Sequence, residues 1–457
     1  MKVTTVLLAA GQGTRMKSDL PKMLHPICGK PMLAHSLAAV MQASDESPVV
    51  IVGHEADQVR ESVFGGVRFV VQDQQLGTGH AVLQAESLLK GKTDFVLVTY
   101  GDMPLLQAST LKRLVETQKS NRGPMTMLTV IADDARGFGR VMRNADGTVA
   151  AIVEEYVATP EQLNVKELNV GAYCFKADWL WNVLHRIKVS PKGEYYLTDI
   201  AELAVKDGLT IQAVVCDDMA ETIGINTRGD LADAEAVMRG RINRAHMLNG
   251  VTIMNPEVAY IETDVKIGKD TLIQPNTYIQ GNTIIGERNK IGPNSHIRNS
   301  KIGNDCAVFM SIMEDAVMED DVNIGPFARL RKGAHLAKHV HMGNFGEVKD
   351  SYLGEGVKMG HFSYIGNAII GTNTNIGAGT ITCNFDGVNK NPTEIGDDVF
   401  IGSDSMLVAP IKIGDRAKTG AGAVVTKDVP ADTLAVGVPA RAIKKLERKT
   451  QNAKDKK

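Results

Sequence analysis

The sequence has few aromatic residues and few cysteines. Phenylalanine, tryptophan and tyrosine together make up 5% of the 457 residues, so aliphatic side chains have to fill most of the core. The five cysteines, Cys28, Cys174, Cys216, Cys306 and Cys383, are scattered and form no Cys-x-x-Cys pair. This distribution argues against a disulfide framework and a zinc site, and it predicts a reducing compartment.

Neither sign of charge is in excess, and long apolar runs are absent. The 51 Lys and Arg residues balance 53 Asp and Glu residues, a net charge of -2, so no sequence-wide attraction to nucleic acid or an anionic membrane is implied. No run reaches the roughly 20 apolar residues of a spanning helix, and the N-terminal apolar run is too short for a signal peptide. We expect a cytoplasmic protein without nucleic-acid or membrane partners, in which a few placed residues bind phosphate.

An aliphatic residue followed by glycine recurs from Ile267 to Gly414. Most gaps between these pairs are six residues or multiples of six, which predicts a stack of small units. The pattern resembles the hexapeptide repeat of left-handed parallel β-helices, a fold common among acyltransferases. We expect the aliphatic residue to point inward and the glycine to let the chain turn a corner. The gap from Ile376 to Ile395 is 19, so we predict a protruding loop over Ala378–Thr393.

The N-terminal half has the pattern of a Rossmann-like α/β domain. Val3–Ala10 is apolar, as expected of a buried parallel strand, and it leads into Gly11-Gln12-Gly13-Thr14-Arg15-Met16. Glycines at a strand end let backbone amides wrap a phosphate chain. Further strands are expected at Val49–Val52, Val67–Val71 and Phe95–Tyr100, and helices at Ala56–Val63 and Thr78–Leu89. This alternation predicts a mostly parallel, doubly wound sheet with ligands at the carboxyl ends of its strands.

Two motifs follow expected strands of this sheet. Gln72 and the segment Gly77-Thr78-Gly79-His80 offer an amide and glycines that could read a base edge. Asp102, in Tyr100-Gly101-Asp102, puts a carboxylate where a metal-bound triphosphate would lie. Taken alone, such an aspartate is more often a helix cap or a turn former. The neighbouring phosphate loop favours the metal role.

The string from Leu8 to Met16, followed by Pro21-Lys22, resembles the signature of nucleotidyltransferases that make nucleotide sugars. With the later motifs, the whole first half resembles the uridyltransferase domain of bifunctional N-acetylglucosamine-1-phosphate uridyltransferases (GlmU type). The resemblance implies that Asp102 and Asn226 hold Mg²⁺. It implies nucleotide and phosphate contacts from Leu8, Ala9, Gly11, Gly13, Thr14, Arg15, Lys22, Gln72, Gly77 and Thr78, and sugar contacts from Tyr100, Gly101, Gly139, Glu154 and Asn169.

A helix is expected between the two halves. Arg228–Leu248 carries apolar residues at spacings of three and four and ends at Asn249-Gly250, as an amphipathic helix does. We predict a nucleotidyltransferase domain over 1–227, a linker helix over 228–250 and a β-helix domain over 251–443. Residues 444–457 are charged and are expected to form a disordered tail.

Several polar residues stand out in the repeat region. For an isolated residue such as His361, a structural hydrogen bond is the more common role. The loop predicted nearby favours a base, because acyl transfer to an amine needs one and imidazole suits that task. Three further histidines, His335, His339 and His341, do not converge on one face of a six-residue repeat, so we do not expect them to bind metal.

This half also resembles the GlmU family, whose β-helix acetylates glucosamine-1-phosphate with acetyl-CoA between subunits of a trimer. Two departures are expected to weaken acetyl-CoA binding: Phe385 stands where tyrosine is usual, and Gly346 replaces a usual valine and would loosen one rung. The resemblance implies His361 as the base, sugar-phosphate contacts from Arg331, Lys349, Tyr364, Asn375 and Lys390, and acetyl-CoA contacts from Ala378, Asn384, Phe385, Ser403 and Ala421.

The sequence therefore predicts a bifunctional enzyme, a homotrimer that acetylates glucosamine-1-phosphate and then transfers a uridylyl group from UTP to N-acetylglucosamine-1-phosphate. Mg²⁺ is the expected cofactor and acetyl-CoA the acetyl donor. The alternative is a nucleotidyltransferase with one activity, whose β-helix serves only assembly or regulation.

Overall fold

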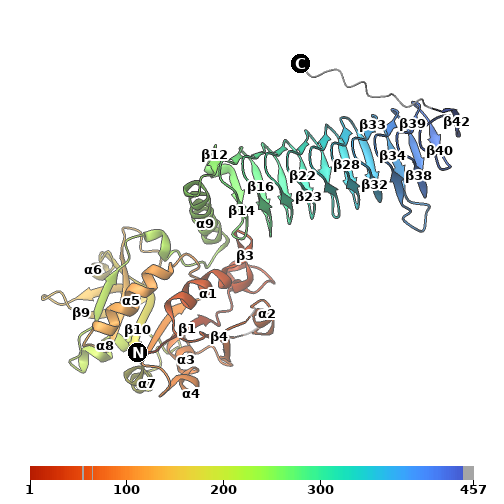
Figure 1. Ribbon diagram of the computed structural model, residues 1–457. Coiled ribbons are helices and arrows are strands. Elements are labelled where there is room, and N and C mark those ends of the chain that lie inside the picture. The colour runs from red at the N-terminus through yellow and green to blue at the C-terminus, as the bar shows by residue number, and fades with distance from the viewer. Residues whose placement is uncertain (54–55, 64, 446–457) are drawn as a thin grey trace. The chain divides into compact units, whose positions relative to one another are not determined.

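The structure, a computed structural model, describes residues 1–53, 56–63 and 65–445 (Figure 1). The chain divides into two compact units, Met1–Met238 and a second that begins at Arg239. The division falls inside helix α9, Arg228–Leu248, whose bounds are those predicted from the sequence. The predicted domain ends at residues 227 and 250 remain predictions.

The first unit is built on a nine-stranded mixed sheet. Its main path runs β11-β7-β10-β6-β1-β4-β5. Strand β1 pairs in parallel with both β4 and β6, whereas β10 runs antiparallel to β6 and β7. The prediction of a mostly parallel sheet is thus confirmed. The bounds are Val3–Ala9 for β1, Val49–Val52 for β4, Arg68–Val71 for β5, Phe95–Tyr100 for β6, Met125–Ile131 for β7, Glu167–Lys176 for β10 and Gln212–Val215 for β11.

Helices cover both faces of this sheet. Alternate residues of β1, Val6 and Leu8, belong to a buried cluster with α3 (Thr78–Leu83) and α7 (Ala177–Leu184). Because successive strand residues point to opposite faces, the other face is left for α1 (Met32–Ala43) and α5 (Ala108–Ser120), which pack on each other. The predicted helix Thr78–Leu89 is divided into α3 and α4 (Glu86–Leu89) by bonds to the third residue back, such as Ala85 N to Val82 O.

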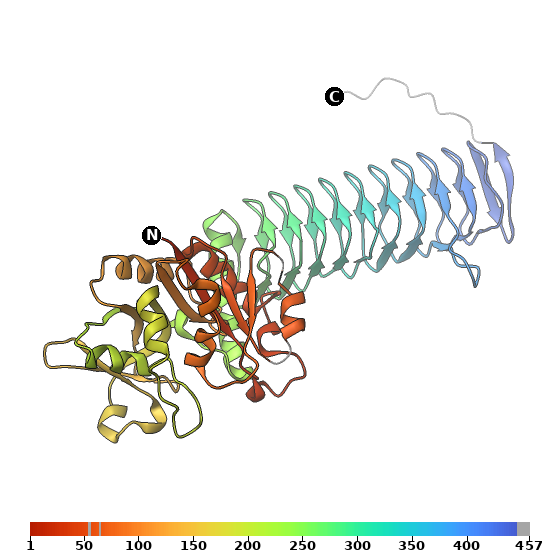
Figure 2. The ribbon, with the colours of Figure 1, turned by 90° about the horizontal axis from the view of Figure 1, so that it is seen from below.

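The second unit is a parallel β-helix of three sheets, seen as a regular stack of short strands in Figures 1 and 2. We name the sheets after their first strands, β12 (Thr252–Ile253), β13 (Ala259–Ile261) and β14 (Lys266–Ile267). They contain twelve, ten and nine strands. The chain visits each sheet once per coil. Aliphatic residues therefore stack in register, as in the pairs Ile273 with Ile291 and Ile285 with Ile302.

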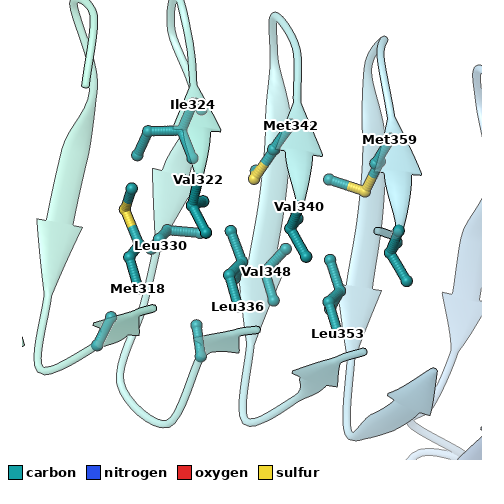
Figure 3. Close-up of a cluster of buried hydrophobic side chains, with 14 of the residues drawn as sticks. Met318, Val322, Ile324, Leu330, Leu336, Val340, Met342, Val348, Leu353 and Met359 are labelled. Atoms are coloured by element: carbon teal, nitrogen blue, oxygen red, sulfur yellow. The ribbon is translucent and has the colours of Figure 1, made fainter. Parts of the chain in front are cut away.

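These stacked residues form the core of the β-helix. Figure 3 shows inward-pointing side chains of successive coils, including Ile324, Met342 and Met359, which are at most 3% exposed. Burial of one such side chain stabilises the fold by roughly 1.5–3 kcal/mol. The expectation that the repeated aliphatic residue points inward is confirmed.

At most positions the repeated glycine acts through the space that it leaves empty and not through a left-handed backbone. Gly268 and Gly402 do not have positive φ, and they are required for space instead. A Cβ on Gly268 would lie 2.7 Å from the Gly286 carbonyl carbon of the next coil. The corners use left-handed Asn and Asp residues such as Asp270 (φ 60°) and Asn276 (φ 56°), because their short polar side chains tolerate that conformation.

Gly346 does not loosen its rung, contrary to expectation. It lies in β28 (Gly346–Lys349) and is buried. A Cβ at this position would be 2.7 Å from the terminal methyl groups of Met342 and Met359. The two methionines, both labelled in Figure 3, fill the space that a valine would occupy.

Two predicted boundaries in the β-helix are corrected. The loop expected over Ala378–Thr393 is shorter, because β34 (Ile381–Cys383) stays in register and only residues 384–392 protrude. Ile376 lies in the β12 sheet and Ile395 in the β14 sheet, so these two residues are not equivalent positions. The tail was expected from residue 444, but Lys444 and Lys445 lie in β42 (Ala440–Lys445) and pair with β41 (Thr433–Gly437). The rest of the predicted tail, 446–457, lies outside the described residues.

Candidate active sites

The carboxyl ends of β1, β5 and β6 meet at a pocket of about 510 Å³. The glycine loop after β1 forms one wall, as parallel-sheet topology predicts. The pocket brings together most of the predicted nucleotide, phosphate and metal residues. Those that line it are Leu8, Gly11, Gly13, Thr14, Arg15, Lys22, Gln72, Gly77, Thr78, Tyr100, Asp102 and Asn226.

At the base of this pocket one ammonium group joins the two predicted metal ligands. Lys22 Nζ donates to Asp102 Oδ2 at 2.5 Å and to Asn226 Oδ1 at 2.9 Å. In the sequence, Asp102 lies 80 positions and Asn226 lies 204 positions after Lys22. A carboxylate and an amide oxygen therefore share a single bound cation.

The predicted base-reading segment is held rigidly. Gln72 is buried, and its Nε2 lies 3.2 Å from Gly77 O and 3.0 Å from His80 Nδ1. Gly77 has φ 97°, and a Cβ there would lie 2.7 Å from Tyr195 O. Glycine is thus required for both conformation and space.

A strap over residues 194–197 completes the pocket. Tyr195 N donates to Leu76 O, and Leu197 N donates to Thr78 Oγ1. Glu194 and Tyr196 of this strap line the pocket, although neither was predicted as a contact residue. The unpredicted lining residues are Ala10, Gln12, Met23, Gln75, Ala81, Glu194 and Tyr196.

The residues predicted to contact the sugar are not all in this pocket. Glu154 Oε1 accepts from Thr198 Oγ1 at 2.9 Å, and Asn169 Nδ2 donates to the Tyr173 hydroxyl at 2.7 Å. A Cβ on Gly139 would lie 3.7 Å from Glu154 Oε2. Glu154 and Gly139 are therefore neighbours.

Ala9 and Gly101, two other predicted contacts, lie behind the residues that line the pocket. Tyr100 lies between the pocket and the predicted sugar residues. Ala9 is buried, and a Cβ on Gly101 would be 3.4 Å from its side chain. Burial, together with the nearby carboxylates of Glu154 and Asp102, raises the pKa of Tyr100 well above its ordinary value. The Tyr100 side chain therefore keeps its hydroxyl proton at neutral pH.

In the β-helix, the predicted base lies in line with predicted acetyl-CoA residues. Lys358, Asn375, Phe400 and Lys418 are register partners in the β12 sheet. The third residue after each is an equivalent position on one corner of the helix, which we call the His361 corner. These positions are His361, Ala378, Ser403 and Ala421. His361 and Ser403 are exposed.

Apart from Lys390, which is in the protruding loop, the predicted sugar-phosphate residues lie in or next to strands of the β12 and β13 sheets. Arg331 and Lys349 hold equivalent positions in successive coils, because Arg329 pairs with Glu347. Arg331 Nη1 donates to Glu347 Oε1 at 2.8 Å, and Glu347 is the register partner of Tyr364. Asn375 lies on the β12 sheet.

The protruding loop carries the remaining predicted residues. Asn384 is 5% exposed, and its Nδ2 donates to Asn367 Oδ1 at 2.7 Å. Phe385 is 55% exposed, and Lys390 Nζ lies 4.4 Å from the centre of its ring. The phenylalanine therefore has a partner for its ring face although the usual tyrosine hydroxyl is missing.

Neither the neighbouring cysteine nor the three-histidine cluster has the features of a reactive or metal centre. Burial raises the pKa of the Cys383 thiol, so it is not a ready thiolate. His335 and His339 lie beside Glu319 and Asp321, each at 2.8 Å. Within the described residues, no group of three His, Cys, Asp or Glu side chains could hold a metal ion.

Comparison with known families assigns both halves of the chain. Residues 5–151 match the MobA-like NTP transferase domain, and residues 264–299 and 392–427 match the bacterial transferase hexapeptide (six repeats). The chain is 45% identical over 433 residues to the "Bifunctional protein GlmU" of Streptococcus agalactiae serotype V, a match covering 94% of each chain. This chain belongs to the GlmU family.

Other members are equally similar. The GlmU protein of Geotalea uraniireducens is 45% identical over 95% of this chain and 96% of its own, and that of Listeria welshimeri 45% identical over 98% and 97%. A solved structure titled a putative glucose-1-phosphate thymidylyltransferase from Bacillus anthracis, in complex with a sucrose, covers 51% of this chain and 94% of its own. Its TM-score is 0.43 at 23% identity.

Membership in the GlmU family confirms several predictions. The chain is a bifunctional transferase with a nucleotidyltransferase part and a hexapeptide acyltransferase part. The hexapeptide match and the three sheets confirm the left-handed parallel β-helix. These matches favour the bifunctional enzyme over the alternative, a nucleotidyltransferase with one activity. Among the described residues, no helix combines the length and apolar character needed to cross a membrane.

Proposed function

We propose that this GlmU protein acetylates glucosamine-1-phosphate with acetyl-CoA and then joins the product to UMP from UTP, releasing pyrophosphate. For the uridylyl transfer in the first domain, the supporting observation is the Lys22–Asp102–Asn226 cluster, which lies beside a glycine loop. A site that places two cations, Arg15 and Lys22, beside a carboxylate and a glycine loop suits phosphoryl chemistry. The trimeric assembly and the cytoplasmic location remain predictions from the sequence.

The uridylyl step needs alignment more than proton transfer. The attacking group is a sugar-phosphate oxygen, which is already an anion at neutral pH. It displaces pyrophosphate at the α-phosphorus as the new P–O bond forms. Arg15 and Lys22 line the pocket and neutralise the charge that grows on the leaving pyrophosphate. Tyr100, held neutral, offers a hydroxyl beside the predicted sugar contacts.

The residues at the base of the pocket fit a magnesium ion. Asp102 and Asn226 present oxygen donors, the type that Mg²⁺ prefers, and both already bind a positive group. When bound, Mg²⁺ would draw electron density from the phosphate oxygens and so lower the barrier to displacement. Two protein oxygens leave room for water and phosphate ligands.

In the acetyl step, His361 is the base that accepts the proton. Its imidazole takes a proton from the glucosamine ammonium group, so that the free amine attacks the thioester carbonyl of acetyl-CoA. A C–N bond forms, the C–S bond breaks, and the second proton of the nitrogen passes to the departing sulfur, which leaves as the CoA thiol. Arg331 and Lys349, cations on the neighbouring sheet, would hold the sugar phosphate. Ala378, Ser403 and Ala421 extend the His361 corner along which acetyl-CoA would lie.

The two assignments are tested by one pair of variants. His361→Ala should reduce acetyl transfer by about 10²–10⁴-fold, the usual contribution of a general base, and leave uridylyl transfer unchanged. Asp102→Asn should reduce uridylyl transfer on the order of 100-fold and leave acetyl transfer unchanged. CoA thiol release and pyrophosphate release measure the two activities.

Matched controls remove similar groups elsewhere. His341→Ala removes an exposed histidine of the same β-helix, and Asp57→Asn an exposed aspartate of helix α2 (Ala56–Glu61). Both should keep both activities. Loss of both activities in a folded His361→Ala protein would refute the division of labour.

A further inference from the structure

The Lys22 ammonium group binds both residues that are predicted to hold the metal ion. Its side chain is 7% exposed and that of Asp102 21% exposed, so the pair is largely removed from water. The same nitrogen bonds the carboxylate of Asp102 and the amide oxygen of Asn226. These are the two oxygens proposed to bind Mg²⁺.

The backbone around Lys22 directs its side chain to this place. Gly13 has φ 64°, and a Cβ there would lie 2.6 Å from Lys22 Cβ and 3.3 Å from Cγ and Cδ. Because glycine has no side chain, there is space beside Gly13 for the aliphatic part of the Lys22 side chain. The glycine of the phosphate loop therefore also seats the lysine.

The backbone segments that carry the two oxygens are fixed by bonds that do not involve the lysine. Ile225 N donates to Asp102 O at 2.9 Å, which ties the two segments together. Asp230, in the first turn of α9, accepts from Asn226 N at 2.9 Å and Thr227 N at 2.8 Å. The two residues are consequently held near each other by bonds that would remain if Lys22 moved away.

A metal and this ammonium group cannot share the two oxygens. Mg²⁺ binds oxygen at about 2.1 Å, and Lys22 Nζ lies within 2.9 Å of both oxygens. The two cations would then lie within a few ångströms of each other in a site with little water, where like charges repel strongly. Lys22 has to move before a metal can bind.

We propose that Lys22 is a resident cation that blocks the metal ligands in the free enzyme and releases them when a triphosphate arrives. This inference rests on the proposed uridylyl function. Arriving phosphates give Lys22 new anionic partners and bring the metal at the same time. Metal and nucleotide binding are therefore coupled, and the coupling is reciprocal. A free divalent ion therefore gains little access to the site before the nucleotide arrives.

Binding of Mn²⁺ alone, without nucleotide, tests the proposal. The electron paramagnetic resonance signal of free Mn²⁺ is titrated with full-length protein. Lys22→Met should bind Mn²⁺ at least about tenfold more tightly than wild type, since a tenfold change needs only about 1.4 kcal/mol. Adding Asp102→Asn to Lys22→Met should remove the gain. Lys17→Met, which removes an exposed cation nearby, should bind as wild type does.

A second comparison does not depend on the folding of Lys22→Met. Wild type and Asp102→Asn should bind Mn²⁺ alone equally weakly, because in the wild type Lys22 is bonded to both metal-ligand residues and blocks them. Tighter binding by wild type than by Asp102→Asn, or no gain in folded Lys22→Met, would overturn the proposal. An enzyme that makes no UDP-sugar would instead refute the proposed function, whatever the Mn²⁺ result.

Discussion

At the scale of single residues, glycines set much of the geometry through the space they leave empty. Gly13 leaves room for the stem of Lys22, Gly77 for the backbone of Tyr195, and Gly268 for the next coil. The sequence marks these positions as special. It cannot say whether conformation or space is the reason, because the contacting atoms come from distant segments.

Gly346 gives a direct test of this steric account. Gly346→Val should destabilise the β-helix by about 1–3 kcal/mol, the usual cost of overpacking a well-filled core, because Met342 and Met359 already fill the space. Denaturant unfolding followed by circular dichroism measures the change.

The methionines provide the control for that variant. In a Met342→Ala, Met359→Ala background the same Gly346→Val change should cost less, since the added methyl groups then enter a cavity. An equal cost in both backgrounds, or stabilisation of the wild type by valine, would contradict the steric explanation.

At the scale of elements, strands and helices with strong patterns were predictable. The bounds of β4, β6 and α9 agree with the prediction. The protruding loop was predicted to exist but with the wrong limits. Counting between Ile376 and Ile395 treats them as residues of one sheet, and only the fold reveals that they belong to two.

Asp386 organises the protruding loop. Its carboxylate accepts from Asn389 N at 2.7 Å, Val388 N at 2.8 Å and Asn391 Nδ2 at 2.9 Å. These bonds, that from Asn389 N most of all, lower the pKa of Asp386 from 3.8 to about 2. Because the pKa is lowered in the folded loop, the carboxylate stabilises it fully above about pH 4 and loses that effect as pH falls towards 2.

Asp386→Ala should therefore raise the KM for acetyl-CoA by about fivefold, through lost order around Phe385 and Lys390. The ratio of variant to wild-type KM should not change between pH 6 and 9, where Asp386 stays ionised. Uridylyl transfer is the internal control and should be unaffected. A KM equal to that of wild type would show that the loop does not take part in acetyl-CoA binding.

At the scale of the whole molecule, two unrelated folds place two constellations that the sequence scatters widely. The family resemblance anticipated which residues matter in the nucleotide pocket. It did not anticipate that Lys22 bridges Asp102 and Asn226, nor that β10 runs against its neighbours, because both depend on segments far apart in sequence. Glu194 and Tyr196 of the strap over 194–197 were not predicted as lining residues, because the bonds that bring the strap to the pocket also join distant segments.

One chain carries two separate transferase activities, and release of free CoA thiol reports whether the β-helix supplies the second of them. Purified protein with acetyl-CoA should release thiol only when glucosamine-1-phosphate is present, and later addition of UTP and Mg²⁺ should yield UDP-N-acetylglucosamine. If the protein makes UDP-N-acetylglucosamine from N-acetylglucosamine-1-phosphate but releases no thiol, the β-helix is an assembly module and the account is wrong.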